Sequence, residues 1–95
     1  MKEFTKSDLK PGQVVETANE GAYMALNMPF GDTERMILMG IDGFLYLTSY
    51  NEDLTRNDKY KTYDIVKVYD TSGHYGLGFS IIRYLESFSV IWERH

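Results

Sequence analysis

The chain has 95 residues, of which 43% are hydrophobic and 25% are charged, and this composition excludes a disordered tail. It predicts one globular domain over residues 1–95, because a chain of this length holds one core and is too short for two. The chain has no cysteine, which excludes disulfides and thiolate metal sites and favours a cytoplasmic location. The net charge of −4 disfavours non-specific binding to nucleic acid and favours a basic protein partner.

The sequence also predicts that the chain is neither secreted by a signal peptide nor inserted in a membrane. The first residues, MKEFTK, carry no apolar core of the kind that a signal peptide needs. No apolar run approaches the roughly 18 residues of a membrane-spanning helix.

The first third of the chain predicts one helical turn and a β-hairpin. Thr5 and Asp8 have the spacing of a helix capping box, and Pro11-Gly12 ends that turn. Residues 13–17 and 22–27 are typical of two strands joined by a turn at 18–21. We expect Val15 and Tyr23 of this hairpin to lie in the core.

A second hairpin is expected after a loop at 28–32. Strands at 35–39 and 44–50 flank Gly40-Ile41-Asp42-Gly43, whose Asp-Gly pair suits the positive φ angles of a tight turn. In the second strand the side chains alternate, with Leu45 and Leu47 on one face and Phe44, Tyr46 and Thr48 on the other.

The remainder predicts a long loop, a strand, a helix and a final strand. Residues 51–63 are polar and aperiodic and are expected to form a surface loop, and residues 64–69 are expected to form a strand. After a loop at 70–76, the spacing of Phe79, Ile82 and Leu85 predicts a short helix within 78–87. In the last strand, 88–93, alternation places Phe88, Val90 and Trp92 on one face and predicts that Trp92 belongs to the core.

These elements predict a mostly β (α+β) fold. Five or six short strands joined by tight turns favour a small SH3-like barrel or a curled antiparallel sheet, with one short helix before the last strand.

Catalytic and metal sites are not indicated, and we expect a non-enzymatic protein without a cofactor. The pair Ser72 and His74 lacks the Gly-x-Ser-x-Gly elbow and shares a glycine-flanked loop, so a solvated loop histidine is the simpler interpretation. Oxygen ligands for calcium or magnesium could come from one acidic segment, but they lack the spacing of a calcium loop and alternate with basic residues. These oxygen ligands are Asn51, Glu52, Asp53 and Asp58.

A glycine-rich segment between the strand and the helix is a candidate phosphate or ligand loop. Backbone amides at such a position can hold a phosphate, and Arg83 could supply charge. The order of the glycines matches neither the dinucleotide fingerprint nor the Walker motif, and a turn that needs positive φ is the alternative. The residues of this candidate loop are Gly73, His74, Tyr75, Gly76 and Gly78.

Aromatic residues give the strongest indication of binding. The chain has eight tyrosines among fourteen aromatic residues, more than a small core can bury with satisfied hydroxyl groups, although tyrosine also suits strands. The segment from Tyr50 to Tyr63 combines tyrosines with both charge signs and is predicted to bind a protein partner. Nucleic acid is disfavoured there because the acidic residues cancel the field of the basic ones. The predicted contact residues are Tyr50, Glu52, Asp53, Arg56, Tyr60 and Tyr63.

Four blocks resemble recurrent blocks of small uncharacterised proteins from phages and prophages of Gram-positive bacteria: LKPGQVVE at 9–16, YNEDLT at 50–55, DIVKVY at 64–69 and IWER at 91–94. The resemblance implies a phage or mobile-element setting, in the cytoplasm of a bacterial host, and no activity or functional residue. Small acidic proteins in that setting often inhibit host systems, and anti-CRISPR proteins are one example. We therefore expect a protein that modulates a host protein. The alternatives are a sponge for a nucleotide signal and a structural protein that forms homo-oligomers through an edge strand.

Overall fold

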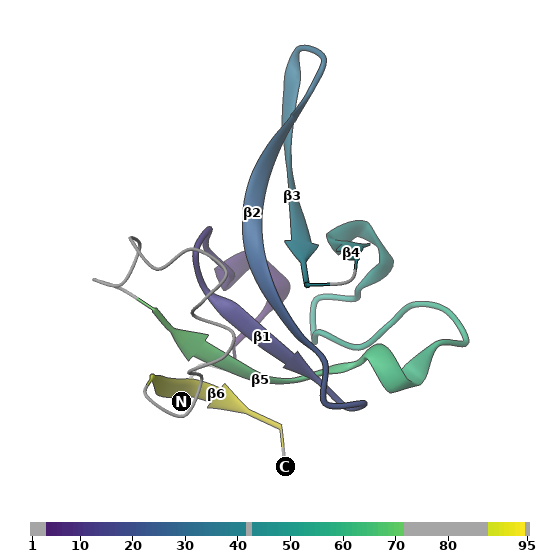
Figure 1. Cartoon of the computed structure of the whole chain (residues 1–95). Coiled ribbons are helices and arrows are strands. Elements are labelled where there is room, and N and C mark those ends of the chain that lie inside the picture. Colours follow the sequence, from purple (N-terminus) through teal and green to yellow (C-terminus); the bar gives the residue numbers. More distant parts are fainter. Residues whose placement is uncertain (1–3, 42, 72–87, 95) are drawn as a thin grey trace.

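The computed structural model describes residues 4–41, 43–71 and 88–94. Six strands form one antiparallel sheet in the order β4-β3-β2-β1-β5-β6 (Figure 1). Over the described residues this sheet stays open, so the predicted curled antiparallel sheet is confirmed and the barrel alternative is not formed. The strands are β1 (Val14–Thr17), β2 (Ala22–Phe30), β3 (Thr33–Met39), β4 (Phe44–Tyr46), β5 (Ile65–Asp70) and β6 (Ser89–Glu93).

Helical structure in the described residues is limited to three single 3-10 turns: η1 (Lys6–Asp8), η2 (Leu47–Ser49) and η3 (Lys61–Tyr63). The capping box predicted for the first turn is present, because the Thr5 amide donates to the Asp8 carboxylate at 2.9 Å. The helix predicted within 78–87 lies outside the described residues.

Strands β2 and β3 form a long ribbon that extends beyond the rest of the sheet (Figure 1). The prediction of a loop at 28–32 was wrong, because β2 continues to Phe30 and its backbone pairs with β3 as far as Phe30 opposite Thr33. Pro29 is tolerated in this strand because β1 pairs only with 22–24, so this end of β2 has a single neighbour. Gly31, with φ of +66°, makes the tight turn.

Each face of the sheet carries its own hydrophobic cluster. Because side chains alternate along a strand, Val14 and Val15 point to opposite faces, and both are fully buried. The predicted core position of Val15 is confirmed, and Tyr23 packs half-buried against the same cluster. The larger cluster comprises Leu9, Val15, Ala25, Leu38, Tyr50, Leu54, Ile65 and Val68. The smaller one comprises Val14, Met24, Tyr69 and Phe88.

The last strand departs from simple alternation. Val68 pairs with Trp92, but Tyr69 pairs with Val90, so β6 contains one extra residue, Ile91, in a β-bulge. The prediction of a shared face was therefore wrong: Trp92 packs half-buried against the larger cluster, Phe88 belongs to the smaller one, and Val90 is 45% exposed.

The second hairpin forms where it was predicted, but Gly43 does not have the positive φ expected of it, and the return strand is shorter. Strand β4 ends at Tyr46 and the chain continues into η2, where a strand had been predicted to reach residue 50. The predicted alternation is confirmed, because Leu45 and Leu47 pack against the larger cluster while Phe44, Tyr46 and Thr48 are exposed.

Candidate functional site: an aromatic ridge between two hollows

Exposed apolar side chains gather around β4, one of the two edge strands of the sheet. Six large hydrophobic residues are exposed among those that the structure describes, and three of them, Ile41, Phe44 and Tyr46, lie in β4 or the turn before it. Phe44 is 51% and Tyr46 is 48% exposed, and their rings meet edge to face with centroids 5.2 Å apart. We call this pair the β4 ridge. The other four exposed residues are Ile41, Tyr60, Val90 and Ile91.

Two hollows lie at opposite ends of β4. The first, of about 590 Å³, has two glutamates in its lining and no basic residue among the described residues that line it, and we call it the acidic hollow. The second, of about 470 Å³, is bordered by Lys6 and Arg35 beside Tyr46. The residues that line the acidic hollow include Glu16, Glu20, Tyr23, Ile41, Phe44 and Tyr63.

The acidic hollow forms where two hairpin turns and η3 come together. In an antiparallel sheet the first and third turns of a meander lie at the same end, which brings the turn at 18–21 beside the turn at 40–43. The segment that contains η3 is fixed to the first turn by two backbone hydrogen bonds of 2.9 Å, from Ala18 N to Asp64 O and from Asn19 N to Thr62 O. The walls of the hollow are therefore held by the sheet itself.

Two glycines make room for the Tyr23 ring in this wall. A Cβ atom on Gly40 would lie 2.9 Å from two carbon atoms of the ring, and one on Gly21 would lie 3.1 Å from another. The Gly40 distance is too short for a side chain, and a side chain at Gly21 would require the Tyr23 ring to move slightly. The ring of Tyr23 consequently lies against backbone at the base of the two turns.

The segment predicted to bind a partner is itself folded against the core. Tyr50 is only 1% exposed, and its hydroxyl donates to the Tyr63 carbonyl at 2.7 Å. Burial raises the pKa of Tyr50 to about 12, against a smaller opposing effect of Arg56. Tyr50 therefore anchors the two ends of the segment to each other.

Arg56 is buried within the same segment. Its guanidinium carbon lies 5.2 Å from the centre of the Tyr50 ring and 5.8 Å from that of Tyr63. The guanidinium donates to both carboxylate oxygens of Asp58, at 3.2 and 2.7 Å. This ion pair raises the pKa of Arg56 and lowers the pKa of Asp58. Arg56 thus stabilises the segment from within.

Glu52 and Asp53 also make local contacts. Glu52 accepts hydrogen bonds from the Ser7 amide and hydroxyl, which attaches the segment to η1. Asp53 accepts one from the Thr55 amide at 3.0 Å, and hydrogen bonds from Thr55 lower its pKa. Between them Leu54 is fully buried although its φ is +71°, a conformation that costs energy for a branched side chain.

Of the six predicted contact residues, Tyr50 and Arg56 are buried. Glu52, Asp53 and Tyr60 are exposed, and Tyr63 is half-buried beside the acidic hollow. The sequence placed Phe44 and Tyr46 on the strand face opposite Leu45 and Leu47 but did not include them in the predicted partner surface. Their alternation with Leu45 and Leu47 was the available signal. The candidate ligand loop at Gly73, His74, Tyr75, Gly76 and Gly78, with Ser72, lies outside the described residues.

No group of three or more His, Asp or Glu side chains that could hold a metal ion occurs in the part of the chain that the structure describes. The helical turns in these same residues include none that is long and apolar enough to cross a membrane.

Comparison with protein-family models, with curated proteins and with solved structures finds no match to the chain.

Proposed function

We propose that this chain is a non-enzymatic binding protein that docks on a basic host protein through the β4 ridge and so modulates it. The observation that carries the proposal is the pair of half-exposed, mutually packed rings of Phe44 and Tyr46 on an edge strand. Rings held against each other lose little further conformational entropy on binding, and aromatic side chains often dominate interface energetics.

The surroundings of the ridge support a protein partner. Ile41 extends the apolar surface at one end of β4, and charged residues border the hollows at both ends. An apolar centre with a polar rim is the usual anatomy of a protein interface. The net charge of −4 favours a basic partner and accelerates its encounter with this chain.

The biological setting is part of the same proposal. The blocks at 9–16, 50–55, 64–69 and 91–94 resemble those of small phage and prophage proteins, which implies a bacterial cytoplasm and a host target. A counter-defence factor, such as an inhibitor of a CRISPR system, would need a compact binding surface and no catalytic group. The β4 ridge meets that requirement.

The test compares two double variants of the chain on the same bait support. Phe44→Ser with Tyr46→Ser removes the ridge, and Val90→Ser with Ile91→Ser removes two exposed apolar side chains from β6, the opposite edge of the sheet. Host proteins that the wild type retains from a Gram-positive bacterial extract are identified by mass spectrometry, purified and titrated against all three proteins.

We expect one basic host protein whose Kd rises at least about 30-fold for the ridge variant, the effect of losing about 2 kcal/mol at interface aromatics. The β6 variant should bind as the wild type does. Equal binding by the ridge variant and the wild type, with both folded, would show that the ridge is not the contact surface.

A further inference from the structure

We infer that the outer edge of β4 receives an extended segment of the partner protein as an added β-strand. The inference rests on the proposed function, because it names the structure through which the partner would dock on the β4 ridge. β4 forms one edge of the sheet, and β3 is the only described strand that pairs with it. An edge strand presents unpaired backbone groups to which another chain can bond.

The register of the second hairpin fixes which backbone groups of β4 point outward. The amide of Gly40 donates to the carbonyl of Gly43 at 2.7 Å, which makes these two residues a hydrogen-bonded pair. Bonded and non-bonded pairs alternate along an antiparallel ladder, so Leu45 bonds to β3 and its two neighbours do not. Phe44 and Tyr46 therefore turn their amides away from β3, and Phe44 its carbonyl as well. No described residue bonds to these three groups.

The opposite edge of the sheet is protected against an added strand. On β6 the bulge at Ile91 interrupts the regular ladder, and Glu93 forms an ion pair with Lys67 at 3.4 Å. Bulges and charged side chains both oppose the addition of a strand. β4 has the sequence Phe-Leu-Tyr, without proline, glycine or charge, and its register against β3 is regular.

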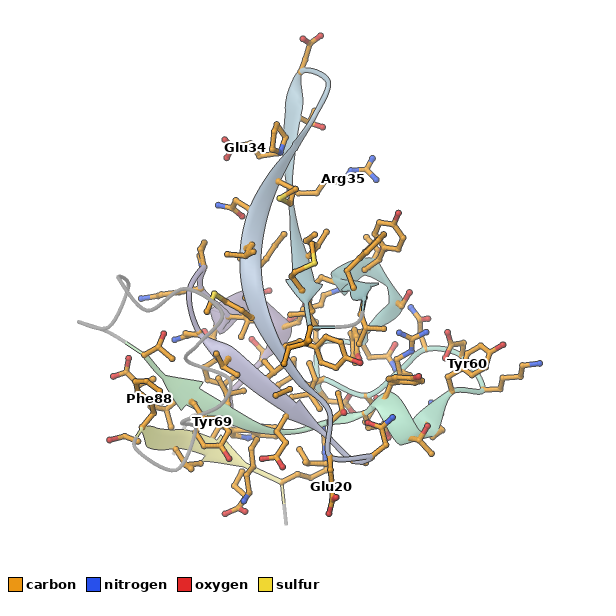
Figure 2. All side chains as sticks on the ribbon, viewed as in Figure 1. Glu20, Glu34, Arg35, Tyr60, Tyr69 and Phe88 are labelled. Carbon is orange, nitrogen blue, oxygen red and sulfur yellow. The ribbon has the colours of Figure 1, made fainter. Side chains whose placement is uncertain are left out.

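The far end of the β2–β3 ribbon also has edges, and they too are protected. Pro29 has no amide hydrogen to offer on the β2 side. On the β3 side Glu34 and Arg35 carry charges, and Figure 2 shows both side chains projecting from the ribbon. The described edge that lacks these protections is β4, whose remaining protection is its short length.

The β4 ridge supplies side-chain contacts where a short strand offers few hydrogen bonds. Directly opposed side chains of paired strands lie on the same face about 5 Å apart. A segment added to β4 would therefore place every second side chain beside the exposed rings of Phe44 and Tyr46. β-Branched side chains pair well with aromatic ones, and the net charge of −4 favours basic residues around them. The inferred occupant is thus an extended basic segment with β-branched residues at alternate positions.

The test is a titration followed by two-dimensional amide NMR, with the peptide acetyl-KVTVK-amide as the probe. When the two valines face the rings, their amides point to β4 and the amide of the central threonine points away. Two matched peptides carry an N-methyl group either on both valines or on the threonine. We expect saturable shifts at Phe44 and Tyr46, with binding at least about tenfold weaker for the valine-methylated peptide and within about twofold for the other.

Amide hydrogen exchange tests the same geometry within the protein. In the free protein the amides of Phe44 and Tyr46 should exchange faster than the amide of Leu45, which is protected by β3. The peptide at about 90% saturation should slow exchange at 44 and 46 by about tenfold, because only the unbound fraction exchanges freely. The exchange of Leu45 should change less.

Equal binding of the three peptides, no saturable shift, or unchanged exchange at 44 and 46 would each overturn the inference. Protection of these two amides in the free protein that grows with its concentration would also overturn it, because a second copy of the chain would then occupy the edge. Host capture that still depends on the rings of Phe44 and Tyr46 would in each case leave the proposed function standing. Peptide binding through the valine amides, combined with host capture that does not need the rings, would refute the ridge and retain strand addition.

Discussion

The hydroxyl of Tyr50 should measurably stabilise the fold, and Tyr50→Phe tests this. The hydroxyl donates to the Tyr63 carbonyl at 2.7 Å in a position that is almost fully buried. Removing it leaves that carbonyl without this donor, which costs about 1–2 kcal/mol. In a domain of this size, such a loss lowers the melting temperature by about 5–10 °C.

The wild type and Tyr50→Phe should also differ in how their stability depends on pH. Burial raises the pKa of Tyr50 from 10.0 to about 12, so between these values the unfolded chain releases the phenol proton while the folded chain keeps it. The free energy of unfolding of the wild type must therefore fall as the pH rises through this window, by about 2–3 kcal/mol in all. Phenylalanine has no proton to release, so the variant lacks this decline.

Chemical denaturation at intervals from pH 7 to pH 11.5 measures both effects. The wild type should be the more stable protein at pH 7, and its advantage over Tyr50→Phe should shrink above pH 10. All residues other than residue 50 are the same in both proteins, so their contributions cancel in the difference. Stability curves that run parallel over the whole range would refute the buried position of Tyr50.

Three further substitutions probe other parts of the molecule, each by thermal and chemical denaturation. Leu54→Ala should cost about 2–4 kcal/mol, because Leu54 is fully buried and alanine relieves none of its positive φ; a change below 1 kcal/mol would contradict its place in the core. Glu20→Gly should raise the free energy of unfolding by about 0.5–1 kcal/mol, because Glu20 has φ of +68° in an exposed turn, and a loss of stability would mean that its side chain holds that turn. Trp92→Ala should cost about 2–3 kcal/mol, since the half-buried indole packs near Phe4 and against the larger cluster, and an unshifted melting temperature would place it on the surface.

The sheet could be predicted from the sequence where alternation and turn residues agree. Both hairpins followed from this agreement, and so did the placement of Phe44 and Tyr46 on the face opposite Leu45 and Leu47. The bulge at Ile91 could not be predicted, because an extra residue in β6 is defined only by its register against β5. Nor could the continuation of β2 through Pro29, since proline ends most strands and is tolerated here by the absence of a second neighbour.

The candidate site was less accessible to sequence reasoning. A polar segment with tyrosines, such as 50–63, has the composition of a binding loop whether its rings point outward or inward. The contact of Arg56 with two rings and Asp58, and the burial of Tyr50, depend on contacts that composition does not encode. The lining of the acidic hollow includes Glu20 and Tyr63, which lie more than 40 positions apart, so it could not be predicted from the sequence.

The most direct test of the central claim replaces Tyr46 with the photoreactive residue p-benzoylphenylalanine and irradiates the protein in an extract of a Gram-positive bacterial host. A matched protein carries the same residue at Val90, which has a similar exposed fraction on the opposite edge of the sheet. We predict that position 46 cross-links to one basic host protein and that position 90 does not. A product that contains two copies of this chain, or a host protein captured only from position 90, would contradict a partner surface at the β4 ridge.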